Sequence, residues 1–201
     1  MVIFVRDQMK RDCKKHISTI IFAVFVLVIL FVPAAKAKLI QGLMEIGLFK
    51  PDVSEDKKAI NADISAIKFK DVKGNVLSLA DLKGKIIFLN FWATWCPPCL
   101  AEMPSINKFY EQYKNDDEVV FLMIDADSDF AKAQNYLNRK KFKFKVYTFA
   151  SDVPKTIFSG KLPTTIVFDK KGRIAMNGVG PANYASKEFL TFIQKLKDLK
   201  E

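Results

Sequence analysis

Residues 85–99 read KIIFLNFWATWCPPC, an apolar run that ends in two cysteines three positions apart. The run over 85–92 predicts a buried strand, and the apolar residues of 100–114 recur with helical spacing. Cys96 would therefore lie where a strand ends and a helix begins. Unpaired backbone N–H groups and the positive end of the helix dipole at such a junction favour a thiolate over a thiol.

A thiolate is the attacking species in thiol–disulfide exchange, and a second thiol nearby resolves the mixed disulfide. The spacing of Cys96 and Cys99 thus predicts redox chemistry. A zinc site is a poorer interpretation, because the only other Cys and His, Cys13 and His16, lie beyond an apolar segment. A purely structural disulfide would close an unusually short loop and would leave the flanking aromatic residues and prolines unexplained.

The N-terminus predicts export. Residues 17–32 are apolar apart from Ser18 and Thr19, and several basic residues precede them. Basic residues before an apolar segment keep the N-terminus in the cytoplasm. We therefore expect a cytoplasmic basic head at 1–16 and a transmembrane anchor or signal segment at 17–35.

Two outcomes remain open for this segment. Ala35-Lys36-Ala37 fits a signal-peptide cleavage site, which would release the chain into the periplasm. The long basic head and the lysine within that site favour an uncleaved, single-pass anchor in a bacterial inner membrane. The catalytic domain is periplasmic in both cases, so Cys96 and Cys99 are the only cysteines on that side. With no other disulfides to form there, we expect these two thiols to react.

The composition excludes some functions. The formal net charge is +10, but no arginine-rich stripe with interleaved aromatic residues is present, so we expect no nucleic-acid binding. A lysine-rich, solvated surface explains the charge. The only histidine is His16, so the predicted exported part has no His-assisted catalysis and no His-rich metal site.

Residues 36–60 form a juxtamembrane connector with an apolar stripe, which predicts docking on the domain, contact with lipid, or a plain linker. Beyond it, apolar patterns alternate between strand and helix. Strands are expected at 64–72, 76–79, 85–92, 119–125, 144–149, 164–169 and 174–179, with helices at 97–114, 130–140 and 186–199, a helical turn at 154–158 and a turn at 80–84. This order predicts an α/β sandwich with a mixed sheet.

The order of these elements, the run FWATWCPPC at 91–99 and the segment LPTT at 162–165 before a strand together resemble the thioredoxin superfamily. Within it, the chain is most similar to the membrane-tethered TlpA/ResA-type thiol–disulfide oxidoreductases. The resemblance covers about residues 61–199. It implies a thioredoxin-like fold over 61–201, with a central mixed sheet flanked by helices.

The resemblance also implies residue roles. Cys96 corresponds to the exposed nucleophile and Cys99 to the buried resolving thiol. Pro163 corresponds to a cis-proline facing the disulfide, rather than an ordinary loop proline, and Leu162 before it offers backbone hydrogen bonds to a substrate segment. Trp95 forms an apolar rim beside Cys96. The predicted substrate-binding residues are Trp95, Pro97, Leu162 and Pro163. Pro104 matches a helix kink and Trp92 belongs to the core.

Glu102 is the third predicted catalytic residue. It lies at i+3 from Cys99, so the two side chains can share a helix face. Thioredoxins carry a proton-accepting Asp at the position of Asn90, and an amide cannot take up a proton. We therefore expect Glu102 to manage the proton of Cys99. The alternative is a solvated carboxylate on a helix face.

Together these features predict a periplasmic thiol–disulfide reductase that needs no cofactor beyond its Cys96–Cys99 pair. Neither Pro97 nor Pro98 has an N–H to stabilise the Cys96 thiolate, which favours the disulfide form and a reducing enzyme. The resemblance implies exported-protein disulfides as substrates, apocytochrome c among them, and a membrane electron donor of the DsbD/CcdA type. Alternatives are an oxidase or isomerase of the same fold, a thiol peroxidase, or a module without redox activity.

Overall fold

The computed structural model of the 201-residue chain describes residues 2–53 and 63–199, with side chains from residue 16 onward. Seven strands form one mixed sheet in the order β2-β1-β5-β4-β3-β6-β7. The strands are β1 (Lys68–Asp71), β2 (Val76–Ser78), β3 (Ile86–Trp92), β4 (Val119–Asp125), β5 (Val146–Phe149), β6 (Thr164–Phe168) and β7 (Ile174–Val179). The helices are α1 (Val2–Phe31), α2 (Pro33–Glu45), α3 (Pro97–Tyr113), α4 (Phe130–Lys140) and α5 (Lys187–Asp198), with a 3-10 helix at Leu79–Leu82.

β3 lies inside the sheet, parallel to β4 and antiparallel to β6, and all seven of its residues are buried. Its side chains alternate between two apolar clusters, as the pleat of a strand requires. Phe88 and Trp92 pack with residues of α3, α4 and α5, whereas Leu89 and Phe91 pack on the opposite face. This alternation directs Asn90, at the centre of the strand, toward the α3 side.

The expected α/β architecture with a mixed sheet is confirmed, with small differences at element ends. β1 begins at Lys68 rather than at residue 64, and β5 begins at Val146 rather than at residue 144. The expected turn at 80–84 overlaps the 3-10 helix. Residues 154–158 form a hydrogen-bonded turn without a helix, in which the N–H groups of Ile157 and Phe158 both donate to the Pro154 carbonyl.

The N-terminal helix ends earlier than predicted. The expected segment 17–35 is interrupted at Val32, where the chain bends by 95° between α1 and α2. Pro33 explains the break, because the residue before a proline avoids the helical conformation and proline suits the first position of a new helix. Over the described residues, no single helix passes a test of length and hydropathy for crossing a membrane. The bent pair His16–Phe31 and Pro33–Glu45 passes only when its two helices are taken together.

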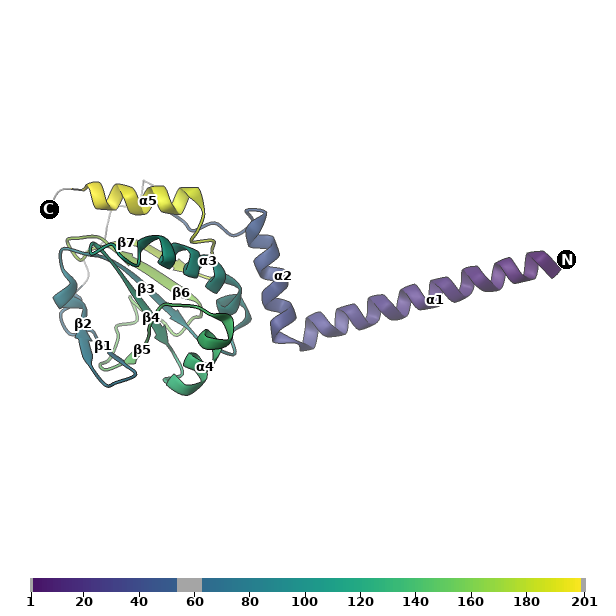
Figure 1. Ribbon diagram of the computed structural model, residues 1–201, viewed down its shortest axis with the longest axis horizontal. Helices are drawn as coiled ribbons and strands as arrows, with labels where there is room; N and C mark the ends of the chain where they lie inside the picture. The colour runs from purple at the N-terminus through teal and green to yellow at the C-terminus, as the bar shows by residue number, and fades with distance from the viewer. Residues whose placement is uncertain (1, 54–62, 200–201) are drawn as a thin grey trace.

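α2 is docked on the domain. Ala37 and Met44 of α2 form a small apolar cluster with Ala101 of α3, and Figure 1 shows α2 between α1 and the domain. Beyond α2, the Phe49 carbonyl accepts from the Asn183 N–H at 3.1 Å. The described part of the predicted connector is therefore attached to the domain. The boundary expected at 60/61 lies outside the described residues.

Candidate active site

The two cysteines lie at the junction of β3 and α3, as the sequence predicts. Cys96 is the N-cap residue of α3, and its sulfur is bonded to that of Cys99, with the two Cα atoms 5.3 Å apart. Pro97 occupies the first turn of the helix, where its fixed φ is favourable and its missing N–H has no helical partner to lose. The prolines between the cysteines therefore help to begin the helix.

One backbone amide supports the Cys96 sulfur. The Cys99 N–H donates to Cys96 Sγ at 3.3 Å, and the Leu100 N–H donates to the Cys96 carbonyl at 3.0 Å. Since Pro97 and Pro98 have no N–H, Cys99 provides the first amide of α3 that can reach the sulfur. In the reduced enzyme the same N–H would stabilise a Cys96 thiolate.

Cys96 is less exposed than predicted. The relative exposure is 3% for Cys96 and 0% for Cys99, so the expectation of an exposed nucleophile is wrong for this disulfide state. The bond to Cys99 holds the Cys96 sulfur in the apolar cluster that contains Trp92 and Ala93. A thiolate that reduces this disulfide therefore has only a small exposed area of Cys96 to attack.

The Leu162–Pro163 peptide bond is cis. Pro163 is buried and Leu162 is half-buried, and Thr164, the first residue of β6, is paired with Phe91 near the end of β3. This pairing brings the loop to the same edge of the sheet as the cysteines. The geometry provides a backbone edge beside the motif, and substrate binding by Leu162 and Pro163 stays a prediction.

Glu102 is fully buried, so the alternative of a solvated carboxylate is wrong. Its Oε1 accepts from Asn90 Nδ2 at 2.8 Å, and its Oε2 accepts from the Ala182 N–H at 3.3 Å. Burial raises the pKa of Glu102 to about 8, although the Asn90 and Ala182 hydrogen bonds oppose that rise. A carboxyl group with such a pKa can accept or release a proton near neutral pH.

Sequence reasoning missed the network that holds Glu102. Asn90 Nδ2 also donates to Thr165 Oγ1 at 2.8 Å, and Thr165 hydrogen-bonds to the buried Tyr184. Burial raises the pKa of Tyr184 well above its usual range, so its hydroxyl stays protonated. Asn90 Oδ1 has no protein partner among the residues that the structure describes. A lone amide within an otherwise apolar strand was the available signal for this network.

The rim of the site contains Trp95 and a second acidic group. Trp95 is 62% exposed, and its indole N–H donates to Asp127 Oδ1 at 2.9 Å. Asp125, paired with Trp92 at the end of β4, is buried, and burial raises the pKa of its carboxyl group. Sequence reasoning did not single out Asp125 or Asp127.

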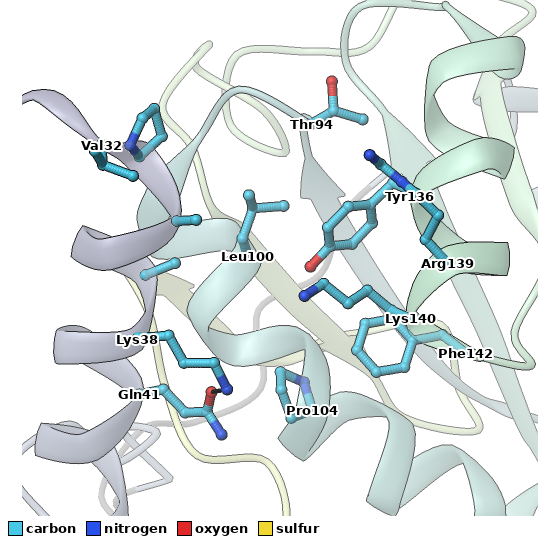
Figure 2. A pocket seen from close by; sticks show the side chains of 13 residues that line it. Val32, Lys38, Gln41, Thr94, Leu100, Pro104, Tyr136, Arg139, Lys140 and Phe142 are labelled. Atoms are coloured by element: carbon cyan, nitrogen blue, oxygen red, sulfur yellow. Dashed lines mark hydrogen bonds between the residues drawn. The ribbon is translucent and has the colours of Figure 1, made fainter.

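A groove with a volume of about 730 Å³ lies beside the cysteine motif, between α2, α3 and α4. Thr94 and Leu100, which flank the two cysteines, line it together with apolar and basic residues (Figure 2). Its basic side chains are Lys38, Arg139 and Lys140. Within residues 16–53 and 63–199, whose side chains the structure describes, no group of three or more His, Cys, Asp or Glu side chains could hold a metal ion.

A disulfide at a strand–helix junction, with a cis-proline at the start of the adjacent strand, defines a thioredoxin-like thiol–disulfide oxidoreductase. Comparison with known proteins supports this class, because residues 51–189 match the Redoxin family model. The chain belongs to the redoxin family.

The named relatives of this chain also catalyse thiol–disulfide exchange, as their names state. The chain is 36% identical over 130 residues to the thiol–disulfide oxidoreductase ResA of Bacillus thuringiensis strain Al Hakam, covering 63% of this chain and 73% of the relative. It is 31% identical to ResA of Halalkalibacterium halodurans, covering 69% and 81%. A crystal structure of a thiol:disulfide interchange protein of the thioredoxin family from Chlorobium tepidum matches with a TM-score of 0.53 at 26% identity, covering 70% and 98%. The chain is therefore an oxidoreductase of the ResA type.

Proposed function

We propose that this oxidoreductase works as a reductase of protein disulfides outside the cytoplasm. The Cys96 thiolate attacks one sulfur of a client disulfide, and a mixed disulfide forms as the other client sulfur leaves as a thiolate. Cys99 then loses its proton and attacks Cys96 Sγ. The second client thiolate leaves, so two electrons pass to the client and the Cys96–Cys99 disulfide forms.

The observation that carries this proposal is the buried Glu102 one helical turn beyond Cys99. Resolution requires Cys99 to be deprotonated, and a carboxylate near its own pKa is an effective acceptor at neutral pH. Because burial raises the pKa of Glu102 to about 8, the group is partly protonated and partly ionised in that range. We infer that Glu102 takes the proton from Cys99.

The reducing direction rests on how little the Cys96 thiolate would be stabilised. Strongly oxidising members of this fold have a cysteine with a very low pKa, which stabilises the reduced form. Here the two prolines leave the Cys99 N–H as the first helix amide that contacts the sulfur. A less stabilised thiolate favours the disulfide form, and the enzyme then gives its electrons to the client.

The proposed location is a bacterial inner membrane, with the domain in the periplasm. Large apolar side chains of α1 are exposed to a degree that suits lipid better than water, including Phe22 at 67%, Phe25 at 57% and Phe31 at 77%. The catalytic domain would be tethered by α1, or released if the segment is cleaved. Its clients would be exported proteins, such as apocytochrome c, and a membrane protein of the DsbD/CcdA type would reduce the enzyme again.

The redox potential tests the direction. The full chain is equilibrated with mixtures of reduced and oxidised glutathione, and the fraction of free thiol is measured by alkylation. We expect the Cys96–Cys99 pair to stay oxidised until the buffer is strongly reducing, well below the roughly −180 mV of protein disulfide isomerase. A potential near the roughly −120 mV of a DsbA-type oxidant would overturn the reductase proposal.

Client capture tests the substrates. In Cys99→Ser, the mixed disulfide at Cys96 cannot be resolved, so clients should stay covalently bound and be identified after purification. Cys96→Ser is the matched control and should capture no client through this route. Capture of cytoplasmic proteins alone from intact cells would contradict the proposed location.

A further inference from the structure

α2 carries two opposite apolar faces. One face is buried on the domain, where Ala37 and Met44 pack with Ala101. On the other side lie Leu39, within α2, and Ile46, the C-cap residue directly after it, whose N–H still donates to the Gly42 carbonyl. The two residues are seven positions apart, about two helical turns, so they lie on the same side. Leu39 is 48% exposed and Ile46 is 74% exposed. A helix that only connects an anchor to a domain has no need of this second face.

The bend between α1 and α2 determines how the exposed apolar face of α2 is oriented relative to α1. α1 leaves the domain as a single arm, and α2 runs across the end of that arm at 95° (Figure 1). If α1 runs along the normal of a membrane, α2 runs within the plane of that membrane. α2 does not enter the hydrocarbon core in this arrangement, because its other face is packed on α3. It therefore lies at the surface, between the bilayer and the domain.

We propose that α2 rests on the outer surface of the membrane crossed by α1, with Leu39 and Ile46 inserted among the lipids. The inference rests on the proposed membrane location. Lys36 and Lys38 lie on the two flanks of the apolar face. The Lys38 ammonium group donates to Gln41 Oε1 at 3.3 Å on the groove side, so the proposed contact with lipid phosphates falls to Lys36. Apolar residues flanked by lysines are typical of helices that lie in a membrane interface.

This placement fixes the catalytic site relative to the membrane. Packed helices have axes about 8–10 Å apart, so α3 would lie about one helix diameter above α2. The Cys96–Cys99 disulfide is at the first turn of α3, close to the end of α2 that joins α1, since Val32 and Pro33 line the same groove as Thr94 and Leu100. A membrane-embedded electron donor could then reach the disulfide without a long periplasmic arm.

Fluorescence quenching by lipid tests the inference on the full chain. Leu39→Trp and Ile46→Trp are reconstituted in nanodiscs of phosphatidylcholine with or without brominated acyl chains, all in the disulfide form. Val76→Trp is the matched control, because Val76 is also an exposed apolar residue, at 60%, but lies on the sheet edge away from α2. The parent chain provides the signal of Trp92 and Trp95 for subtraction.

We expect bromine to remove most of the added emission at positions 39 and 46 and to leave the added emission at position 76 unchanged. A glutathione midpoint equal to that of the parent shows that each variant is folded. Unquenched emission at 39 and 46 in a nanodisc-bound chain would overturn the inference while leaving the anchor and the redox proposals intact. A cross-linked dimer through these residues would assign the face to a second copy instead. A chain that does not bind nanodiscs would overturn both the surface contact and the anchor, and its redox potential would still test the reductase proposal.

Discussion

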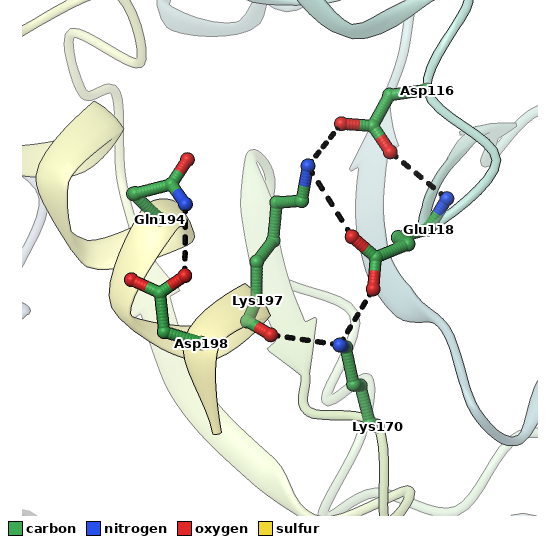
Figure 3. Close-up of polar contacts among 6 residues, drawn as sticks. All are labelled: Asp116, Glu118, Lys170, Gln194, Lys197 and Asp198. Carbon is green, nitrogen blue, oxygen red and sulfur yellow. Dashed lines mark hydrogen bonds and ion pairs between the residues drawn. The ribbon is translucent and has the colours of Figure 1, made fainter. Parts of the chain in front are cut away.

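Two clusters of polar side chains in this protein shift the pKa of their carboxyl groups in opposite directions. Glu102 lies inside the domain with amide donors from Asn90 and Ala182. Asp116 and Glu118 lie just before β4, beside the ammonium groups of two lysines, Lys170 and Lys197, as Figure 3 shows. Burial raises the pKa of Glu102 to about 8, whereas the lysine hydrogen bonds lower the pKa of Asp116 and Glu118.

This difference shows that neutral hydrogen-bond donors and cationic partners suit a carboxyl group to different roles. A neutral N–H donor favours the ionised carboxylate less than a cation does, so the effect of burial prevails and Glu102 can exchange a proton near neutral pH. A lysine fixes the charged state, so Asp116 and Glu118 remain ionised and connect the end of α5 to the sheet. The first cluster is suited to chemistry and the second to structure.

The largest expected effect is on catalysis. Glu102→Gln removes the proton acceptor and retains the shape of the side chain, so the resolution step should slow by about 10²–10⁴-fold, the usual contribution of general acid–base catalysis. Single-turnover release of a fluorescent client from the mixed disulfide measures this rate. Glu118→Gln is the control and should leave the rate unchanged. Equal rates in Glu102→Gln and the parent would remove the functional distinction between the two clusters.

The pH dependence of stability should differ as well. The pKa of Glu102 is higher in the folded chain than its usual 4.5, so its contribution to stability is complete below pH 4.5 and is lost as the pH rises through about 8. After allowance for relaxation of the buried site, we expect a loss of about 3 kcal/mol over this range. Urea unfolding of the oxidised parent and of Glu102→Gln at several pH values measures it. A parallel decline in both proteins would contradict the assignment to Glu102.

Asn90→Ala tests how the hydrogen-bond donor affects the pKa of Glu102. This change removes one hydrogen bond to Glu102 and one to Thr165, at a cost of about 2 kcal/mol in the free energy of unfolding. It should also raise the pKa of Glu102 further, because the Asn90 bond opposes the effect of burial. The pH profile of the resolution step should then move to higher pH. An unshifted profile would show that Asn90 does not tune Glu102.

The smallest effect is expected in the ion-pair cluster. Lys197→Met removes the partner of Asp116, and partly exposed pairs of this kind are worth about 0.5 kcal/mol after screening by solvent. The pKa of Asp116 is lowered in the folded chain, so this contribution is present above its usual value and is lost as the pH falls through the folded one. Urea unfolding should show a larger difference from the parent at pH 7 than at pH 3.

The strand–helix junction at Cys96 was predictable because apolar periodicity and cysteine spacing are both local. The burial of Glu102 was not, since it depends on Ala182, which is 80 residues away in the loop between β7 and α5. Docking of α2 stayed one of three alternatives, because an apolar stripe does not identify the surface that covers it. The low exposure of Cys96 depends on packing around the motif, which local patterns do not report.

One detail at the rim gives the chain a built-in optical reporter. Trp95 precedes the reactive sulfur directly, and its exposed ring is held by Asp127 at 2.9 Å rather than left to rotate. Trp92 is enclosed in the same apolar cluster as Cys96 and Cys99. Opening the sulfur–sulfur bond therefore changes the surroundings of both indoles, one exposed and one enclosed. The intensity of ultraviolet-excited emission can therefore follow electron flow through the enzyme in real time, without an attached dye.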